Sequence, residues 1–265
     1  MGTRGTSSKR AFAERRERHA LEEALKREGI DVPVHYDETT ESTNTTALDM
    51  AARGEPEWTV VAAGHQIGGR GRLGRTWVSG PNSSLLFSFI LRPPMPPDRA
   101  LLLTLLSAVA MAEAAEAEAG VKVGCKWPND LLVDDRKVAG ILAEARVRGR
   151  SLQHVVIGLG MNLRDVPDGV EGAAPLGPVD RFALLAGFLR RFRELYTPGG
   201  DGFAQLVVSA YAPRCATLGR AVTATTLGGR IVEGVAVDLD LKGNLVVETK
   251  VRREVVGFGE IQHLR

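Results

Sequence analysis

The chain has 265 residues, 44% hydrophobic and 25% charged, a composition that excludes a disordered protein and leaves room for a large and a small domain. Its 34 basic and 32 acidic residues give a net charge of +2, which provides no global argument for binding nucleic acid or a membrane. Cys125 and Cys215 are too few for a disulfide framework or a cysteine-rich metal site, so we expect buried reduced thiols, although a single disulfide stays open.

The N-terminal segment predicts a polar tail and one short helix. The first eight residues are small and polar and favour disorder, and residues 9–29 place Leu21 and Leu25 at helical spacing before Gly29. A DNA-binding winged helix needs about three helices and a hairpin, which this segment is too short to supply. No apolar run reaches the roughly 18 residues of a membrane span, so we expect a cytoplasmic protein.

The central part of the chain alternates between the patterns of strands and helices. Helices are predicted within residues 40–54, 100–120 and 181–196, and strands within residues 57–66, 83–93, around Val123, in a hairpin over 130–147, and within 154–163. Ser42, Thr43 and Asn44 are candidate cap residues for the first of these helices. This mixture predicts an α+β domain.

Short alternating runs follow residue 220 and predict a small antiparallel barrel or sandwich. The runs lie at residues 221–226, 230–240, 244–250 and 254–264, with glycine-containing turns between the first three. The last two runs lack the glycine turn that we would expect between them. We therefore divide the chain into a tail and short helix (1–33), a large α+β domain (34–215) and a small β domain (216–265).

The sequence GGRGRLGRTW, residues 68–77, is called the glycine-arginine loop below. It sets Arg70, Arg72 and Arg75 among glycines and ends on Trp77. Guanidinium groups suit phosphate or carboxylate, glycine lets a ligand approach the backbone, and an indole can stack on a base. A basic surface hairpin is the alternative interpretation. The loop matches neither a Walker motif nor a dinucleotide-binding motif.

Two further stretches carry polar residues that their local structure does not explain. In CKWPNDLLVDDRKVAG, Asn129 and Asp130 follow Pro128 at a turn, and Lys137 lies across the predicted hairpin. A carboxylate beside lysines can hold magnesium on a phosphate, although such a segment is also common as a surface hairpin. In GLGMNL, Asn162 ends a strand, where it is either a turn residue or a ligand-binding amide.

The three stretches, together with STN at residues 42–44, resemble the biotin protein ligase family, in which STN, GRGRxGRxW, KWPND, K(V/L)AGIL and G(L/I)GxN recur in this order. The resemblance runs from about Tyr36 to the C-terminus. It implies an α+β fold in which a mixed β-sheet packed with helices, similar to class II aminoacyl-tRNA synthetases, precedes a small Src-homology-3-like β-barrel. It also implies a two-step reaction: biotin and MgATP give biotinyl-5′-adenylate and pyrophosphate, and the adenylate acylates one lysine of a biotin carboxyl carrier protein domain of a carboxylase such as acetyl-CoA carboxylase.

Roles for individual residues follow from the same resemblance. It implies that Ser42, Thr43, Asn44 and Gln66 bind the ureido ring of biotin, that Arg70, Gly71, Arg72 and Lys137 bind its carboxylate, that Arg70, Arg72, Arg75, Trp77, Asn129, Lys137 and Asn162 bind ATP, and that Asp130 holds Mg²⁺. Arg72, Lys137 and Asp130 are the expected catalytic residues.

Other interpretations stay open at this point. A lipoate or octanoate transferase of the same superfamily would also acylate a carrier lysine, but it lacks the glycine-arginine loop. A biotin-binding regulator without catalysis would not need Lys137 and Asp130. An exposed sheet edge is compatible with a homodimer, and we expect His65, beside Gln66, to face solvent.

Overall fold

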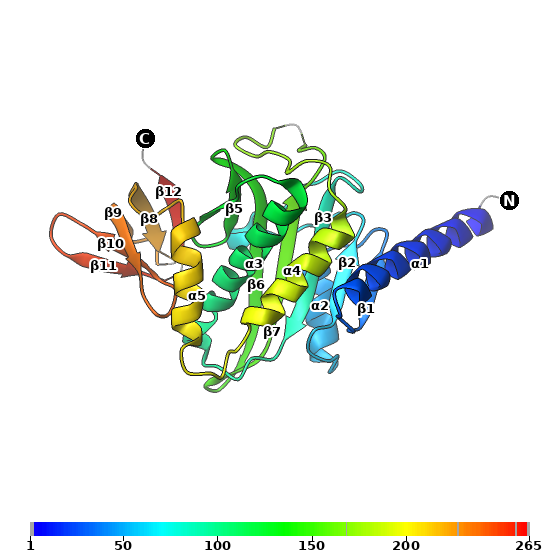
Figure 1. Cartoon of the computed structure of the whole chain (residues 1–265), viewed down its shortest axis with the longest axis horizontal. Helices are drawn as coiled ribbons and strands as arrows, with labels where there is room; N and C mark the ends of the chain where they lie inside the picture. Colours follow the sequence, from blue (N-terminus) through cyan, green and yellow to red (C-terminus); the bar gives the residue numbers. More distant parts are fainter. Residues whose placement is uncertain (1–2, 168, 227, 258, 264–265) are drawn as a thin grey trace.

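Two β-sheets organise the part of the chain that the structure, a computed structural model, describes: residues 3–167, 169–226, 228–257 and 259–263. The larger sheet and its helices form the centre of the molecule. The smaller sheet lies at one end, and the N-terminal helix α1 (Thr3–Arg27) projects at the other (Figure 1). The predicted order of a mixed α+β unit followed by a small β unit is confirmed.

The larger sheet has seven strands in the order β1-β2-β3-β7-β6-β5-β4. They are β1 (Val34–Asp37), β2 (Val60–Ala63), β3 (Ser84–Leu91), β4 (Gly124–Lys126), β5 (Asp130–Val133), β6 (Arg136–Arg148) and β7 (Ser151–Asn162). β1 pairs with β2 in parallel, and the other neighbours are antiparallel, so the sheet is mixed as predicted. Strand β1 was not predicted from the sequence.

Helices pack on both faces of this sheet. They are α2 (Thr43–Ala52), α3 (Leu101–Ala119) and α4 (Arg181–Leu195). A further helix that was not predicted, α5 (Phe203–Tyr211), packs against α3. On β3 the side chains of Phe87 and Phe89 pack against Phe188 of α4, with ring centroids 5.3 and 5.7 Å apart. On the opposite face Ile90 packs against Ala47 of α2. The period-2 alternation of β3 thus separates a helix-covered face from a face that only the short α2 covers.

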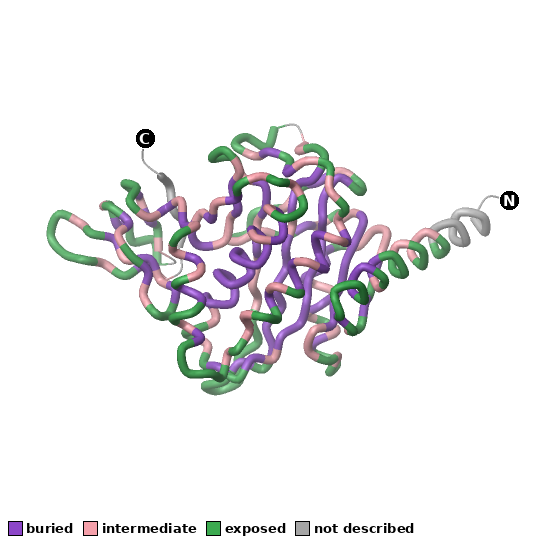
Figure 2. Tube along the Cα trace, in the orientation of Figure 1, coloured by how far each residue is buried: buried purple, intermediate pink, exposed green. Residues whose placement is uncertain are grey.

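Burial is deepest in the sheet and in α3 (Figure 2). The α3 segment, 97–119, is long and apolar enough to cross a membrane by length and composition, which corrects the expectation that no run reaches that length. Most of this segment is buried inside the protein. The helix packs against α4, α5 and the sheet, so its apolar character is explained by the core.

The N-terminal helix is longer than predicted, because it begins at Thr3 within the expected polar tail. The segment contains no proline to end a helix that packing fixes further along. Leu21 and Leu25 are buried in the core, whereas Phe12 is 65% exposed on the projecting part. The protein body therefore supports the C-terminal half of α1.

The smaller sheet has five antiparallel strands in the order β11-β10-β9-β8-β12. They are β8 (Ala221–Thr226), β9 (Ile231–Leu239), β10 (Leu245–Glu248), β11 (Arg253–Val256) and β12 (Gly259–His263). The turn between β10 and β11 closes without glycine, since Thr249 donates from both N and Oγ1 to the carbonyl of Arg252. Closure of this sheet into a barrel stays a prediction.

Trp127 joins the two sheets. It is 1% exposed, its backbone N–H donates to Thr217 Oγ1 at 3.0 Å, and its Nε1 donates to the carbonyl of Gly243 at 2.9 Å. Beside it, Cys125 and Cys215 are buried free thiols, as expected, and burial raises the pKa of the Cys125 thiol to about 12. Burial also raises the pKa of the Cys215 thiol, so both thiols are protonated at neutral pH. The exact domain boundaries stay a prediction.

Candidate functional site

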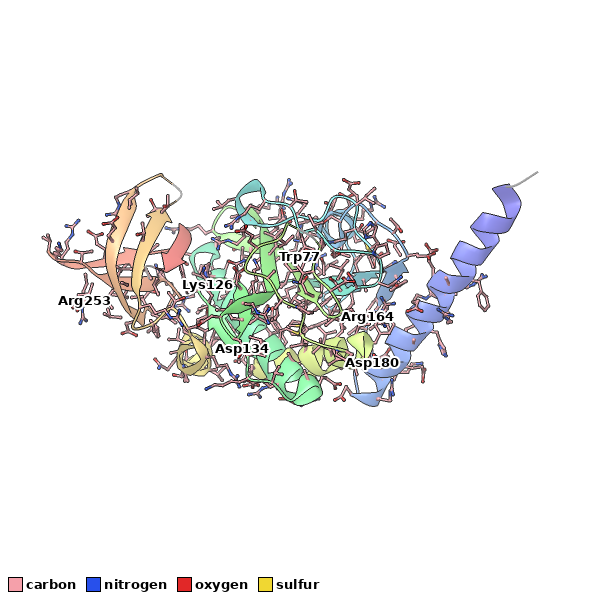
Figure 3. All side chains as sticks on the ribbon, turned by 90° about the horizontal axis from the view of Figure 1, so that it is seen from above. Trp77, Lys126, Asp134, Arg164, Asp180 and Arg253 are labelled. Carbon is pink, nitrogen blue, oxygen red and sulfur yellow. The ribbon has the colours of Figure 1, made fainter. Side chains whose placement is uncertain are left out.

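A polar pocket opens on the face of the larger sheet that α2 covers only in part. It is lined by Ser42, Thr43, Asn44, Gln66, Arg70, Gly71, Arg72, Arg75, Trp77, Asn129, Asp130 and Lys137, together with backbone of β6 and β7. Trp77 lies near the middle of the molecule in the view from above (Figure 3). The fold thus brings together twelve of the thirteen residues that the sequence assigned to the site, from three separate stretches of chain.

Two glycines of β7 form the floor of this pocket. Gly158 and Gly160 lie on the same face of the strand, as alternate residues do. A Cβ on Gly158 would come within 1.8 Å of Asn44 Oδ1, and a Cβ on Gly160 within 2.6 Å of the Trp77 indole. These glycines make room for the two side chains. The GLG sequence at residues 158–160 signals this arrangement, although only Asn162 of this stretch was predicted to belong to the site.

Hydroxyl and amide groups line the α2 end of the pocket. The Thr43 N–H donates to Gln66 Oε1 at 2.7 Å, and Thr43 Oγ1 lies 3.0 Å from the same oxygen. Ser88 Oγ, fully buried on β3, donates to Asn44 Oδ1 at 2.6 Å and lies 2.8 Å from Thr43 Oγ1. Ser88 was missed because it is one of two serines in an otherwise apolar strand. We call these four side chains the amide-hydroxyl array.

Glu144 of β6 is the other residue that sequence reasoning missed. Its Oε2 accepts from Asn44 Nδ2 at 2.9 Å, and its Oε1 accepts from Arg70 Nη2 at 2.5 Å. The carboxylate therefore connects the amide-hydroxyl array to the glycine-arginine loop. It lies four residues beyond Gly140, on the same strand face that lines the pocket.

The glycine-arginine loop forms a narrow hairpin. Trp77 N donates to the Gly69 carbonyl at 2.9 Å, and Gly71 N donates to the Arg75 carbonyl at 2.7 Å. Gly69 has no room for a side chain, since a Cβ there would lie 2.3 Å from the Trp77 carbonyl. Arg72 Nη1 donates to Asn129 Oδ1 at 2.8 Å, which ties the loop to the turn after Pro128.

Lys137 and Asp130 form an ion pair in the wall of the pocket, where Lys137 Nζ lies 2.7 Å from Asp130 Oδ1. The ammonium group also lies 5.9 Å from the centroid of the Trp77 ring. Within the described residues, no group of three or more His, Cys, Asp or Glu side chains could hold a metal by itself. A magnesium ion usually takes only one or two carboxylates when phosphate oxygens and water complete its shell, and Asp130 fits that requirement.

Two predicted residues differ from expectation in their surroundings. Asn162 is buried outside the pocket lining, and its Nδ2 donates to the Ala174 carbonyl at 3.4 Å, so its contact with a nucleotide stays a prediction. His65 is half-buried, and its Nδ1 is buried with no hydrogen-bond partner among the described residues. The expectation that His65 faces solvent holds only in part, because the side chain is half-buried and its Nδ1 is covered.

Comparison with known proteins gives two family matches. A model described as "Biotin/lipoate A/B protein ligase family" matches residues 36–162, and one described as "Biotin protein ligase C terminal domain" matches residues 217–264. The chain is 34% identical to a bifunctional ligase/repressor BirA of Bacillus spizizenii, over 85% of this chain and 72% of that protein. It is 34% identical to a biotin–[acetyl-CoA-carboxylase] ligase of Paracoccus denitrificans, over 84% of this chain and 97% of that protein.

A solved structure supports the same comparison. The fold is similar to that of a biotin protein ligase from Aquifex aeolicus in complex with biotin and ATP, with a TM-score of 0.72 and 26% identity. The match covers 88% of this chain and 99% of that one.

Proposed function

Because the chain belongs to the biotin protein ligase family, we propose that its polar pocket activates biotin with ATP and then transfers the biotinyl group to a lysine of a carrier domain. The chain is a biotin protein ligase, and two of its relatives are named biotin–[acetyl-CoA-carboxylase] ligases. The observation that carries the assignment of the pocket is the meeting of the glycine-arginine loop, the turn after Pro128 and the STN segment around one cavity.

In the first step, a carboxylate oxygen of biotin attacks the α-phosphorus of ATP, and pyrophosphate leaves. Negative charge collects on the phosphate oxygens during this step, and fixed cations stabilise it more strongly than they stabilise the substrates. Arg72 and Lys137 both line the pocket that this charge would occupy. Asp130 would hold a magnesium ion on the phosphates, and that ion supplies further charge neutralisation.

In the second step, the amine of the carrier lysine attacks the acyl carbon, loses a proton, and displaces AMP. We assign the ureido ring of biotin to Ser42, Thr43, Asn44 and Gln66, since a small polar ring in an otherwise apolar pocket needs several fixed donors and acceptors. One side of the Trp77 indole lies on the glycine floor, and we assign its other side to the adenine ring.

The remaining assignments extend the same proposal. The acceptor is a biotin carboxyl carrier domain, Mg²⁺ accompanies ATP, and the reaction takes place in the cytoplasm. Arg75 meets the outer phosphates. The lipoate or octanoate alternative is not favoured, because the biotin-ligase C-terminal family also matches residues 217–264.

Mass spectrometry of a carrier domain incubated with the protein, biotin and MgATP tests this function. We expect one added biotinyl group on one lysine, together with biotin-dependent release of pyrophosphate. Replacing biotin with lipoate or octanoate should give no product. Biotin binding without pyrophosphate release would contradict the enzyme and favour a regulator.

Substituting Arg72→Gly is expected to leave adenylate formation partly active but to let the adenylate escape. Arg72 is tied to Asn129 at the edge of the pocket, and its loss opens a route for water and for the intermediate. Lysines of an unrelated protein such as albumin should then be biotinylated. The measurement compares labelling of a carrier domain and of albumin at matched adenylate production.

The matched control is Arg150→Gly, which removes an exposed arginine from the turn between β6 and β7, outside the pocket lining. It should label albumin no more than the wild-type protein does. If Arg72→Gly also labels albumin at the wild-type level, Arg72 does not retain the intermediate.

A further inference from the structure

Glu144 occupies a position that the proposed function does not explain. Its carboxylate is the acceptor at one end of a hydrogen-bonded chain that runs through Asn44, Ser88 and Thr43 to Gln66. An ionised carboxylate can only accept hydrogen bonds. Its position therefore limits how every group further along the chain can be oriented.

The orientation of the Asn44 amide follows first. Asn44 Nδ2 faces two acceptors, Glu144 Oε2 at 2.9 Å and the Leu142 carbonyl at 3.3 Å. The amide oxygen must then point the other way, toward Ser88 Oγ. Because an amide oxygen cannot donate, the single hydroxyl hydrogen of Ser88 is committed to Asn44.

The array then has more hydrogen-bonding contacts than hydroxyl hydrogens to form them. Three contacts, Ser88 with Asn44, Ser88 with Thr43, and Thr43 with Gln66 Oε1, depend on the hydroxyl hydrogens of Ser88 and Thr43 alone. Gln66 Oε1 is fixed in place because the Thr43 N–H donates to it. The array therefore keeps an unfilled acceptor position beside the pocket, which suits a ligand that offers N–H groups.

We propose that Glu144 is a positioning residue that keeps the amide-hydroxyl array rich in acceptors, and so matches it to the N–H groups of the biotin ureido ring. The inference rests on the proposed function, since it concerns how that site recognises biotin. Glu144 acts through Asn44 and has no assigned contact with biotin. Its bond to Arg70 is a second contact of the same carboxylate, directed toward the glycine-arginine loop.

The substitution Glu144→Gln is expected to reverse the donor-to-acceptor direction of the hydrogen bonds in the array, while the shape of the side chain stays nearly the same. A glutamine has one acceptor oxygen for two donors, Arg70 and Asn44, and the charged donor forms the stronger bond. The amide N–H group of the new glutamine then faces Asn44. The Asn44 amide turns, so that its oxygen accepts from the glutamine and its nitrogen faces Ser88. Ser88 can now donate to Thr43, and the acceptor position that biotin would use is filled.

Titration calorimetry of the whole chain without ATP tests the proposal, with biotin and with biotinol, the analogue in which the carboxylate is reduced to an alcohol. Glu144→Gln should weaken binding of both ligands by about tenfold or more, the size expected when one buried hydrogen-bonding pair is mismatched. Glu144→Asp keeps an acceptor-only carboxylate and should bind more tightly than Glu144→Gln. Glu233 is an exposed residue of β9, so Glu233→Gln is the control for loss of one negative charge and should bind both ligands like the wild-type protein.

Each other outcome overturns the proposal in a distinct way. Loss confined to biotin would show that Glu144 acts through Arg70 on the carboxylate end. Glu144→Gln binding more tightly than Glu144→Asp would show that side-chain shape matters and hydrogen-bond direction does not. Unchanged affinity in Glu144→Gln would remove the inference and leave the function standing, whereas a wild-type protein that binds no biotin would contradict both. Thermal unfolding of each variant verifies that the fold is retained.

Discussion

Replacing Lys137 with alanine is expected to slow biotinyl-adenylate formation by about a hundredfold or more while biotin binding is largely kept. Lys137 Nζ lies in the pocket beside Asp130 and the Trp77 ring. The proposed mechanism places there the charge that develops on the α-phosphate in the transition state. Removing one fixed donor from such a position typically costs 10²–10³ in rate. Biotin-dependent exchange of pyrophosphate into ATP measures the rate, and calorimetry measures biotin affinity.

The control for this experiment is Lys122→Ala, which removes an exposed lysine outside the pocket. It should exchange pyrophosphate like the wild-type protein. Near wild-type exchange in Lys137→Ala would show that the ammonium group does not stabilise the reacting centre. An equal loss in affinity and in rate would instead assign Lys137 to ground-state binding.

Substituting Gly158→Ala should weaken biotin binding by about ten- to a hundredfold, the range that corresponds to the cost of forcing a methyl group into a packed site. The added Cβ would lie 1.8 Å from Asn44 Oδ1, so the Asn44 amide must leave its place between Ser88 and Glu144. Binding of ATP, whose proposed contacts lie at the other end of the pocket, should change much less. Calorimetry with each ligand separately measures both affinities.

Gly124→Ala is the matched control, because a Cβ at that strand glycine would meet its nearest neighbour, the Ala216 side chain, at an ordinary 3.8 Å. It should bind both ligands normally. If Gly158→Ala binds biotin as tightly as Gly124→Ala does, the Asn44 position is not needed for recognition.

The predicted strands and helices were those with strong local signals. The short apolar run of β3, the glycine-containing turns of the smaller sheet and the long apolar run of α3 each mark an element within a short window of sequence. The four-residue β1 has too few residues to show a period, and α5 follows a turn rich in glycine that gave no sign of a further helix. The extent of α1 depends on the docking of Leu21 and Leu25, which sequence alone does not show.

The site was predictable to the extent that its residues belong to contiguous motifs. Ser88 and Glu144 belong to none of the motifs, and each contacts a residue that is distant in sequence. Asn44 meets Ser88 across a separation of 44 residues and Glu144 across 100. Their strand face could have indicated them. Residues two positions away in sequence lie on the same face of a strand, and for Ser88 and Glu144 those residues include ones that pack on α2 or line the pocket.

The three tryptophans lie in three different parts of the molecule, so their intrinsic fluorescence can report on each part separately. Trp77 lies in the pocket, so its fluorescence would respond when biotin or a nucleotide arrives. Trp127 is sealed between the two sheets, and its emission would shift to longer wavelength if the smaller sheet separated and admitted water. Trp58 stacks on Phe89, with ring centroids 6.3 Å apart, and would report loss of the core itself. Variants that retain one tryptophan each would therefore resolve ligand arrival, separation of the smaller sheet and global unfolding as three distinct signals.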